Sequence, residues 1–263
     1  MRVIDQPNTG FSGARNAGIR QAHGRYLLFV DSDDILVPGA IDSLIYMAEK
    51  TKADIVDGGF RRFADNEGDF SSIPGLAYIY DIIQHDNNLP QSEDTRQTNG
   101  FICGKLISRN LFNNVEFPLG YWFEDSIYCM IIEPMSRRNA SVATQVFRYR
   151  MRRGSISHIF TDKPKAIDNI YITLRLLCDR KTLGIDFDQR QYDMMLRQMF
   201  MNTWCVMWLP KDVAYAVFVI QRELINERLS NWHTDNIKLQ HIERFIRQND
   251  FYGLIRWCKW HEC

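Results

Sequence analysis

The first thirty residues pass from a polar segment through a short amphipathic stretch to an apolar run. Ser12 is placed to cap a helix that continues to about Gln21, and Gly24 is placed to end it. The apolar run at residues 25–30 predicts a strand that is covered on both faces. Only a few residues precede the helix.

A second helix and a second strand follow. Pro38 lies where a helix favours proline, in its first turn. The apolar face of this helix is predicted from helical spacing and consists of Ile41, Leu44, Ile45 and Ala48. Residues 54–60 predict the next strand. The order helix, strand, helix, strand is typical of an α/β sheet.

The middle of the chain changes in composition. Residues 64–99 are rich in Asp, Asn, Gly, Ser, Pro and Gln, which predicts a long loop or hairpin insertion. Regular structure is expected again from about Phe101, with a helix at 123–135. Residues 141–150 are rich in Val, Phe and Tyr and predict a strand.

From Lys163 onward the apolar residues recur at helical spacing. Further helices are predicted at 188–208, 211–229 and 235–259. We therefore expect a domain boundary near residue 160, with an α/β domain at 1–160 and a helical region at 161–263.

Bulk composition excludes some classes of function. The 263 residues carry 32 basic and 32 acidic side chains, so the net charge gives no support for general nucleic-acid binding. The six cysteines are scattered, which favours reduced thiols and a cytoplasmic protein. The sequence shows neither a signal peptide nor an apolar run long enough to span a bilayer.

Three carboxylates follow the strand at 25–30, namely Asp31, Asp33 and Asp34. Carboxylates this close repel one another unless a cation or hydrogen-bond donors intervene. In open α/β sheets ligands bind where strands end. Oxygen ligands at such a place suit Mg²⁺ or Mn²⁺, which also bridge to a diphosphate. The alternative is a solvated acidic turn.

These elements resemble a known family. Residues 8–19 (Asn-Thr-Gly-Phe-Ser-Gly-Ala-Arg-Asn-Ala-Gly-Ile) and residues 26–34 are similar to the second half of the nucleotide-sugar domain of family 2 glycosyltransferases. The resemblance implies an incomplete Rossmann-like sheet of the A-type glycosyltransferase fold, followed by the all-helical region. It also implies transfer of a sugar from a nucleoside diphosphate to an acceptor hydroxyl.

The resemblance also implies roles for individual residues. Asp31 faces the ribose side of the donor, and the metal ligands are Asp33, Asp31 and Asp34. Four residues of the preceding motif are assigned to the donor: Asn8, Gly10, Arg15 and Asn16. The implied cofactors are Mn²⁺ or Mg²⁺ and a nucleotide-sugar donor, in the first place a UDP-sugar.

A second block, at residues 104–125, adds a candidate base. It ends in Glu124 and Asp125, which resemble the catalytic carboxylates of the family. We expect Asp125 to remove the proton of the acceptor hydroxyl and Glu124 to orient Asp125 or the acceptor. In the alternative interpretation the pair only complements the dipole of the helix that it precedes.

A third block, at residues 147–157, is rich in arginine. By resemblance Arg150 and Arg153 bind the diphosphate leaving group and offset its charge. The alternative is a solvated basic face of a strand, because arginine recurs there at alternate positions.

The basic amphipathic stretch at 236–260 leaves two interpretations open. It either packs on the catalytic domain or makes peripheral contact with the inner face of a membrane, which suits a lipid-linked acceptor. The predicted partners are the nucleotide sugar and a glycan or lipid-linked acceptor, with no nucleic acid.

The leading hypothesis is a metal-dependent, inverting glycosyltransferase of surface polysaccharide or glycoconjugate synthesis. In the family a strand–helix–strand segment that binds the nucleobase precedes the first motif, and we expect this segment to be missing before Val3. The alternative function is therefore a catalytically impaired fragment that binds a sugar or a partner. A nucleotidyltransferase, the third candidate, has no glycine-rich phosphate loop in support.

Overall fold

The computed structural model describes residues 2–63, 101–151 and 163–260. The chain divides into two compact units. The first unit comprises Met1–Gly120 and Glu124–Arg153, and the second comprises Tyr121–Phe123 and Gly154–Cys263. The predicted boundary near residue 160 and the predicted insertion at 64–99 lie outside the described residues.

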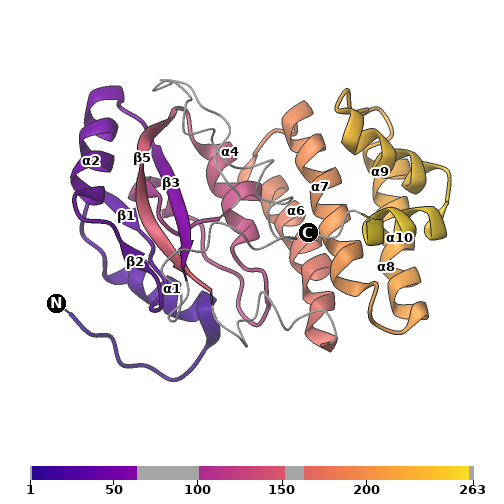
Figure 1. Cartoon of the computed structure of the whole chain (residues 1–263), viewed down its shortest axis with the longest axis horizontal. Coiled ribbons are helices and arrows are strands. Elements are labelled where there is room, and N and C mark those ends of the chain that lie inside the picture. Colours follow the sequence, from indigo (N-terminus) through magenta and orange to yellow (C-terminus); the bar gives the residue numbers. More distant parts are fainter. Residues whose placement is uncertain (1, 64–100, 152–162, 261–263) are drawn as a thin grey trace. The chain divides into compact units, whose positions relative to one another are not determined.

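The first unit is built on a mixed sheet of five described strands (Figure 1). They are β1 (Tyr26–Leu28), β2 (Ile35–Leu36), β3 (Ile55–Phe63), β4 (Leu106–Ser108) and β5 (Asn139–Arg150). Their order across the sheet is β1-β4-β3-β5-β2. The pair β3 and β5 is parallel, and the other neighbours are antiparallel. The α/β class predicted from the sequence is thereby confirmed.

Pairing with β5 positions the acidic turn. Ile35 of β2 pairs with Arg148, and Phe63 of β3 pairs with Arg150. The end of β5 therefore lies beside the residues that immediately precede β2, which are the predicted metal ligands.

The strand predicted at 25–30 is shorter and less covered than expected. β1 has three residues, of which Leu27 is buried while Tyr26 and Leu28 are half-buried. Phe29 then forms an isolated parallel bridge with Cys103. β1 is the last strand on its side of the described sheet, and its burial alternates, with Leu27 on the more covered face.

Helix α1 (Gly10–Gln21) has Thr9 at its N-cap position, three residues before the predicted cap Ser12. Ser12 therefore lies inside the helix and does not cap it. Its side chain is buried, and its Oγ donates a hydrogen bond to the carbonyl of Pro118 at 2.6 Å. The helix ends at Gln21, as predicted, but the C-terminal cap residue is Ala22 rather than Gly24.

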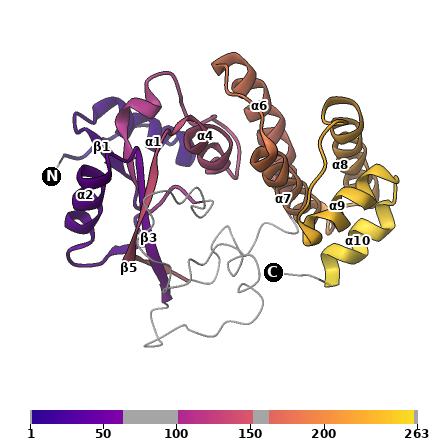
Figure 2. The same cartoon turned by 90° about the horizontal axis from the view of Figure 1, so that it is seen from above.

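Helix α2 (Ala40–Thr51) lies on one face of the sheet, opposite the face that carries α4 (Glu133–Met135) (Figures 1 and 2). Leu44 and Ala48 are buried as predicted, but Ile41 and Ile45 are exposed. The buried face is completed by Ala40 and Met47, which pack with residues of β3, β4 and β5. The helix is rich enough in apolar residues that spacing alone did not select the correct face.

The helix predicted at 123–135 is irregular. Its central turn, Tyr128–Ile132, has π-helical hydrogen bonding, and α4 follows it directly. Glu124 and Asp125 lie in the turn that precedes this helical stretch.

The second unit is helical, as predicted. Its main helices are α6 (Asp168–Leu183), α7 (Gln189–Val206), α8 (Lys211–Glu223), α9 (Ile237–Arg247) and α10 (Phe251–Trp260). Helix α7 contacts each of the other four. The single helix predicted at 235–259 is two helices, because the chain turns at Asn249, whose φ is 58°. Among the described helices none has the length and apolar character needed to cross a membrane.

Candidate functional site

Arg15 of α1 connects the acidic turn after β1 with the segment that precedes the π-helical turn. Its Nη2 lies 3.1 Å from Asp31 Oδ1, and its Nη1 forms an ion pair with Glu124 Oε1. Glu124 lies 109 residues after Arg15 in the chain. The fold therefore brings three of the predicted site residues into direct contact.

This bridge is largely shielded from water. The side chains of Arg15 and Glu124 are 13% and 9% exposed, whereas that of Asp31 is 43% exposed. Burial disfavours the charged guanidinium, but the charges of Glu124 and Asp31 outweigh it and raise the pKa of Arg15. Arg15 is cationic at any working pH. Asp31 is the member of the bridge that a ligand can reach.

Two side chains of α1 hold the loop that leads toward Glu124. The Nδ2 of Asn16 donates to the carbonyl of Phe117 at 2.9 Å, and its Oδ1 accepts from the Phe117 N–H at 2.8 Å. Ser12 adds its bond to Pro118. Asn16 is 3% exposed, so in this structure it anchors the loop. Its predicted contact with a donor stays a prediction.

Asp125 has an altered acidity. Burial and the neighbouring charge of Glu124 raise the pKa of Asp125 to about 7, against the smaller opposing effect of Arg15. A carboxyl with a pKa near neutrality exchanges a proton readily at working pH. This property suits the predicted role as a base, which stays a prediction.

The acidic turn is tied to the end of β5. The Arg150 N–H donates to Asp34 Oδ1 at 2.9 Å, and Arg150 Nε donates to the carbonyl of Asp33 at 2.7 Å. Burial, together with the charges of Asp31 and Asp33, raises the pKa of Asp34 to about 6 despite the bond from Arg150. Arg150 thus holds the turn, and its predicted contact with a diphosphate stays a prediction.

The acidic turn fits a divalent cation of the magnesium type. Among the described residues none donates a hydrogen bond to Asp34 Oδ2, which is buried. Within residues 2–63, 101–151 and 163–260, no three His, Cys, Asp or Glu side chains lie close enough together to form a metal-binding group by themselves. Mg²⁺ is commonly held by one or two carboxylates together with the phosphates of a substrate, so the residues present are sufficient. The predicted ligand set is thus compatible with the geometry and stays a prediction.

The remaining predicted donor residues lie at the start of α1 or outside the described structure. Asn8 is exposed, and its Oδ1 accepts from the Gly10 N–H at 3.0 Å. Gly10 has a φ of 75°, which glycine adopts without strain. Arg153 lies outside the described residues.

The sequence interpretation missed two buried groups near the site. Burial and the charge of Asp31 raise the pKa of the Cys103 thiol to about 12. Lys105, which precedes β4, places its Nζ 3.4 Å from Oδ2 of Asp57 in β3, and both side chains are fully buried. The sequence does show one charged residue inside each of two apolar segments, which indicates a buried charge. It does not show that these two residues pair with each other.

Comparison with known proteins shows which family the first part of the chain resembles. Residues 1–114 match the family described as Glycosyl transferase family 2. Glycosyltransferase GlyA of Streptococcus pneumoniae serotype 4 is 31% identical over 61% of this chain, and GlyG of the same organism is 29% identical over 71%. The chain spans 24% of the length of GlyA and 64% of that of GlyG.

A solved structure supports the fold. The crystal structure of S. aureus TarS 1–349 in complex with UDP-GlcNAc superimposes with a TM-score of 0.67 at 14% sequence identity. The match covers 97% of this chain and 73% of the TarS chain. Both the α/β unit and the helical unit are therefore parts of a fold already observed. Residues 1–114 of the chain are therefore similar to glycosyl transferase family 2.

Proposed function

We propose that this chain transfers a sugar from a nucleotide-sugar donor to an acceptor hydroxyl. The observation that carries the proposal is the Arg15 bridge, which joins the acidic turn at Asp31 to Glu124. It keeps two groups of carboxylates at one site of the first unit. In the proposed transfer, one group holds a metal ion at the diphosphate of the donor, and the other takes the proton of the acceptor hydroxyl.

The proposed donor is a UDP-sugar, in line with the UDP-GlcNAc complex of the similar TarS structure. Asp33, with Asp31 and Asp34, is proposed to hold Mn²⁺ or Mg²⁺. When bound, such an ion neutralises charge on the departing diphosphate. Asn8, Gly10, Arg15 and Asn16 are the proposed donor side of the site.

Asp125 is the proposed base. The acceptor oxygen forms a bond to the anomeric carbon, while the bond between that carbon and the diphosphate oxygen breaks. The hydroxyl proton passes to Asp125, and the electron pair of the broken bond leaves with the diphosphate, whose charge Arg150 and Arg153 offset. Direct displacement of this kind inverts the anomeric configuration.

Glu124 is the proposed positioning residue of this step. It precedes Asp125 and is held by Arg15, so the orientation of the base depends on the bridge. The proposed acceptor is a glycan or lipid-linked sugar of surface polysaccharide or glycoconjugate synthesis. Such a role places the protein in the cytoplasm, with peripheral contact at the inner face of the membrane.

The test is release of UDP from UDP-sugars in the presence of Mn²⁺, measured for the full chain and for two variants. We expect Asp33→Ala and Asp125→Asn each to reduce the release rate at least a hundredfold. Asp179→Asn is the matched control, because Asp179 lies on α6 and pairs with Arg175. Its rate should stay within twofold of the unchanged chain.

Retained turnover in both site variants would refute the site assignment. Saturable binding of UDP-sugars without any turnover would instead support the alternative function, a non-catalytic module that binds a sugar or a partner.

A further inference from the structure

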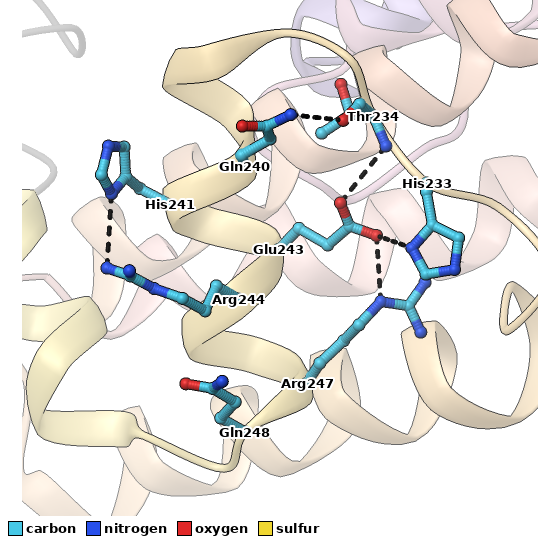
Figure 3. Close-up of a pocket in the computed structure, with 8 residues that line it drawn as sticks. All are labelled: His233, Thr234, Gln240, His241, Glu243, Arg244, Arg247 and Gln248. Carbon is cyan, nitrogen blue, oxygen red and sulfur yellow. Dashed lines mark hydrogen bonds and ion pairs between the residues drawn. The ribbon is translucent and has the colours of Figure 1, made fainter.

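The second unit contains a pocket, lined by polar and charged residues, that the proposed transfer does not use. Its volume is about 510 Å³. Figure 3 shows its lining, which comes from α9, from the segment before that helix and from the residue that follows it. The residues are His233, Thr234, Gln240, His241, Glu243, Arg244, Arg247 and Gln248.

Glu243 lies at the centre of the lining, and its carboxylate is fully engaged. Oε1 accepts from Tyr192 at 2.7 Å and from Arg247 Nε at 2.9 Å, and it lies 3.0 Å from His233 Nδ1. Oε2 accepts from the Thr234 N–H at 3.2 Å. Burial opposes ionisation, but these hydrogen bonds outweigh it and hold the pKa of Glu243 below its ordinary value. Glu243 is therefore an anion whose oxygens already have donors.

Arg247 is fixed by this network. Its Nη2 donates to the carbonyl of Trp232 at 2.6 Å and to the Tyr192 hydroxyl at 3.1 Å. The side chain is 21% exposed and forms part of the pocket lining. A cation held in one orientation loses little conformational entropy when a ligand binds.

Arg244 and His241 form a second group of donors on the outer face of α9. Arg244 is exposed, and its Nη2 lies 3.4 Å from His241 Nδ1 (Figure 3). The His241 ring stacks on Trp257 with a centroid distance of 4.3 Å. A guanidinium carries five N–H donors, so this contact leaves Arg244 with donors for a ligand. Gln248, one turn beyond Arg244, adds an exposed amide.

The charge balance of the lining favours an anion. The lining carries two arginines and one carboxylate, and Arg247 pairs with that carboxylate, so the charge of Arg244 is not balanced by a carboxylate of the lining. A phosphate group offers several acceptor oxygens and matches the planar fork of a guanidinium. The volume is of the size found for small-molecule sites and exceeds that of one bare ion. A larger molecule that carries a phosphate fits these properties.

We propose that this pocket of the second unit binds a phosphate monoester, with Arg244 contacting the phosphate and with Arg247 and Gln248 contacting the remainder of the ligand. Two sources supply this chemistry, a soluble sugar phosphate and the headgroup of an anionic phospholipid. The proposal does not depend on the transfer activity of the first unit.

The test uses the full chain and follows the arginine side-chain N–H signals by nuclear magnetic resonance. Glucose 1-phosphate is titrated against glucose, which lacks the phosphate, and vesicles of phosphatidic acid are compared with vesicles of phosphatidylcholine. We expect Arg244→Ala to weaken binding of the phosphate ligand at least tenfold. Arg256→Ala, which removes an exposed arginine of α10 outside the pocket, should change it less than twofold.

Binding of glucose 1-phosphate without vesicle binding assigns the soluble source, and vesicle binding alone assigns the lipid headgroup. The proposal is overturned if neither ligand binds, or if glucose binds as well as its phosphate. It is equally overturned if Arg256→Ala weakens binding as much as Arg244→Ala. Binding of the sugar phosphate at the first unit would leave the Arg244→Ala variant unaffected, which separates this test from that of the transfer site.

Discussion

At the scale of single residues, Arg15 is the centre of the candidate site. It neutralises Glu124, which is nearly buried, and Asp31, which is half exposed. Removal of one partner of a buried ion pair leaves the other charge without compensation. The bridge therefore supports both the local fold and the arrangement of the carboxylates.

We expect Arg15→Ala to lower the free energy of unfolding by about 2–4 kcal/mol, because Glu124 then remains buried without its cation. Unfolding in urea measures this change. Arg20→Ala on the same helix is the control, because its pair with Glu116 is 3.3 Å long and mostly exposed. The control should stay within about 0.5 kcal/mol of the unchanged chain. An equal loss of stability in both variants would show that the Arg15 bridge contributes no more than an exposed ion pair.

The raised pKa of Asp125 predicts a pH profile. A base acts in its ionised form, so kcat/KM should fall about tenfold per pH unit below about 7 and level off above it. The measurement is UDP release between about pH 5 and about pH 9. An acid limb centred near the ordinary pKa of aspartate would contradict the assignment of Asp125 as the base in this environment.

The sequence predicted which residues belong to the candidate site, but it did not predict which of them contact one another. The resemblance singled out Asp31, Glu124 and Arg15 separately. Their contact depends on a loop that Asn16 and Ser12 fix from 101 and 106 residues away. Local patterns do not contain such distant pairings.

At the scale of elements, Gly104 is required by the packing of the sheet. Its φ is 75°, and a side-chain carbon added there meets the ring of Phe147. We expect Gly104→Ala to lower the free energy of unfolding by about 2–4 kcal/mol, through backbone strain and overpacking. Urea unfolding again provides the measurement.

Gly18→Ala is the matched control, because Gly18 lies inside α1 and an added carbon meets nothing within 4 Å. This change should leave stability unchanged or raise it by up to about 1 kcal/mol, since alanine favours a helix. A loss of stability at Gly18 comparable to that at Gly104 would argue against the packing explanation.

The spacing of apolar residues predicted that these helices exist, but it did not predict which face is buried or where a helix ends. The spacing around Leu44 predicted α2 correctly but included Ile41, which is exposed because the sheet covers a different sector of the helix. The break at Asn249 was missed because apolar spacing continues across it. Tertiary packing decides both features.

At the scale of the whole molecule, the structural similarity and the family similarity cover different lengths of the chain. The TarS structure matches nearly the full length, but the family match ends at residue 114. Glu124 and Asp125 lie beyond that match, and the pocket around Glu243 lies further still. These parts carry the proposals that most need experiment.

The central claim is that the first unit binds a nucleotide sugar through a divalent ion at the acidic turn. The direct measurement is isothermal titration calorimetry of the full chain with UDP-GlcNAc, with and without Mn²⁺. We expect saturable heat with Mn²⁺ and its loss both without the ion and in Asp33→Ala, while Asp179→Asn binds normally. Absence of heat at millimolar UDP-GlcNAc, or equal binding with and without Mn²⁺, would contradict it.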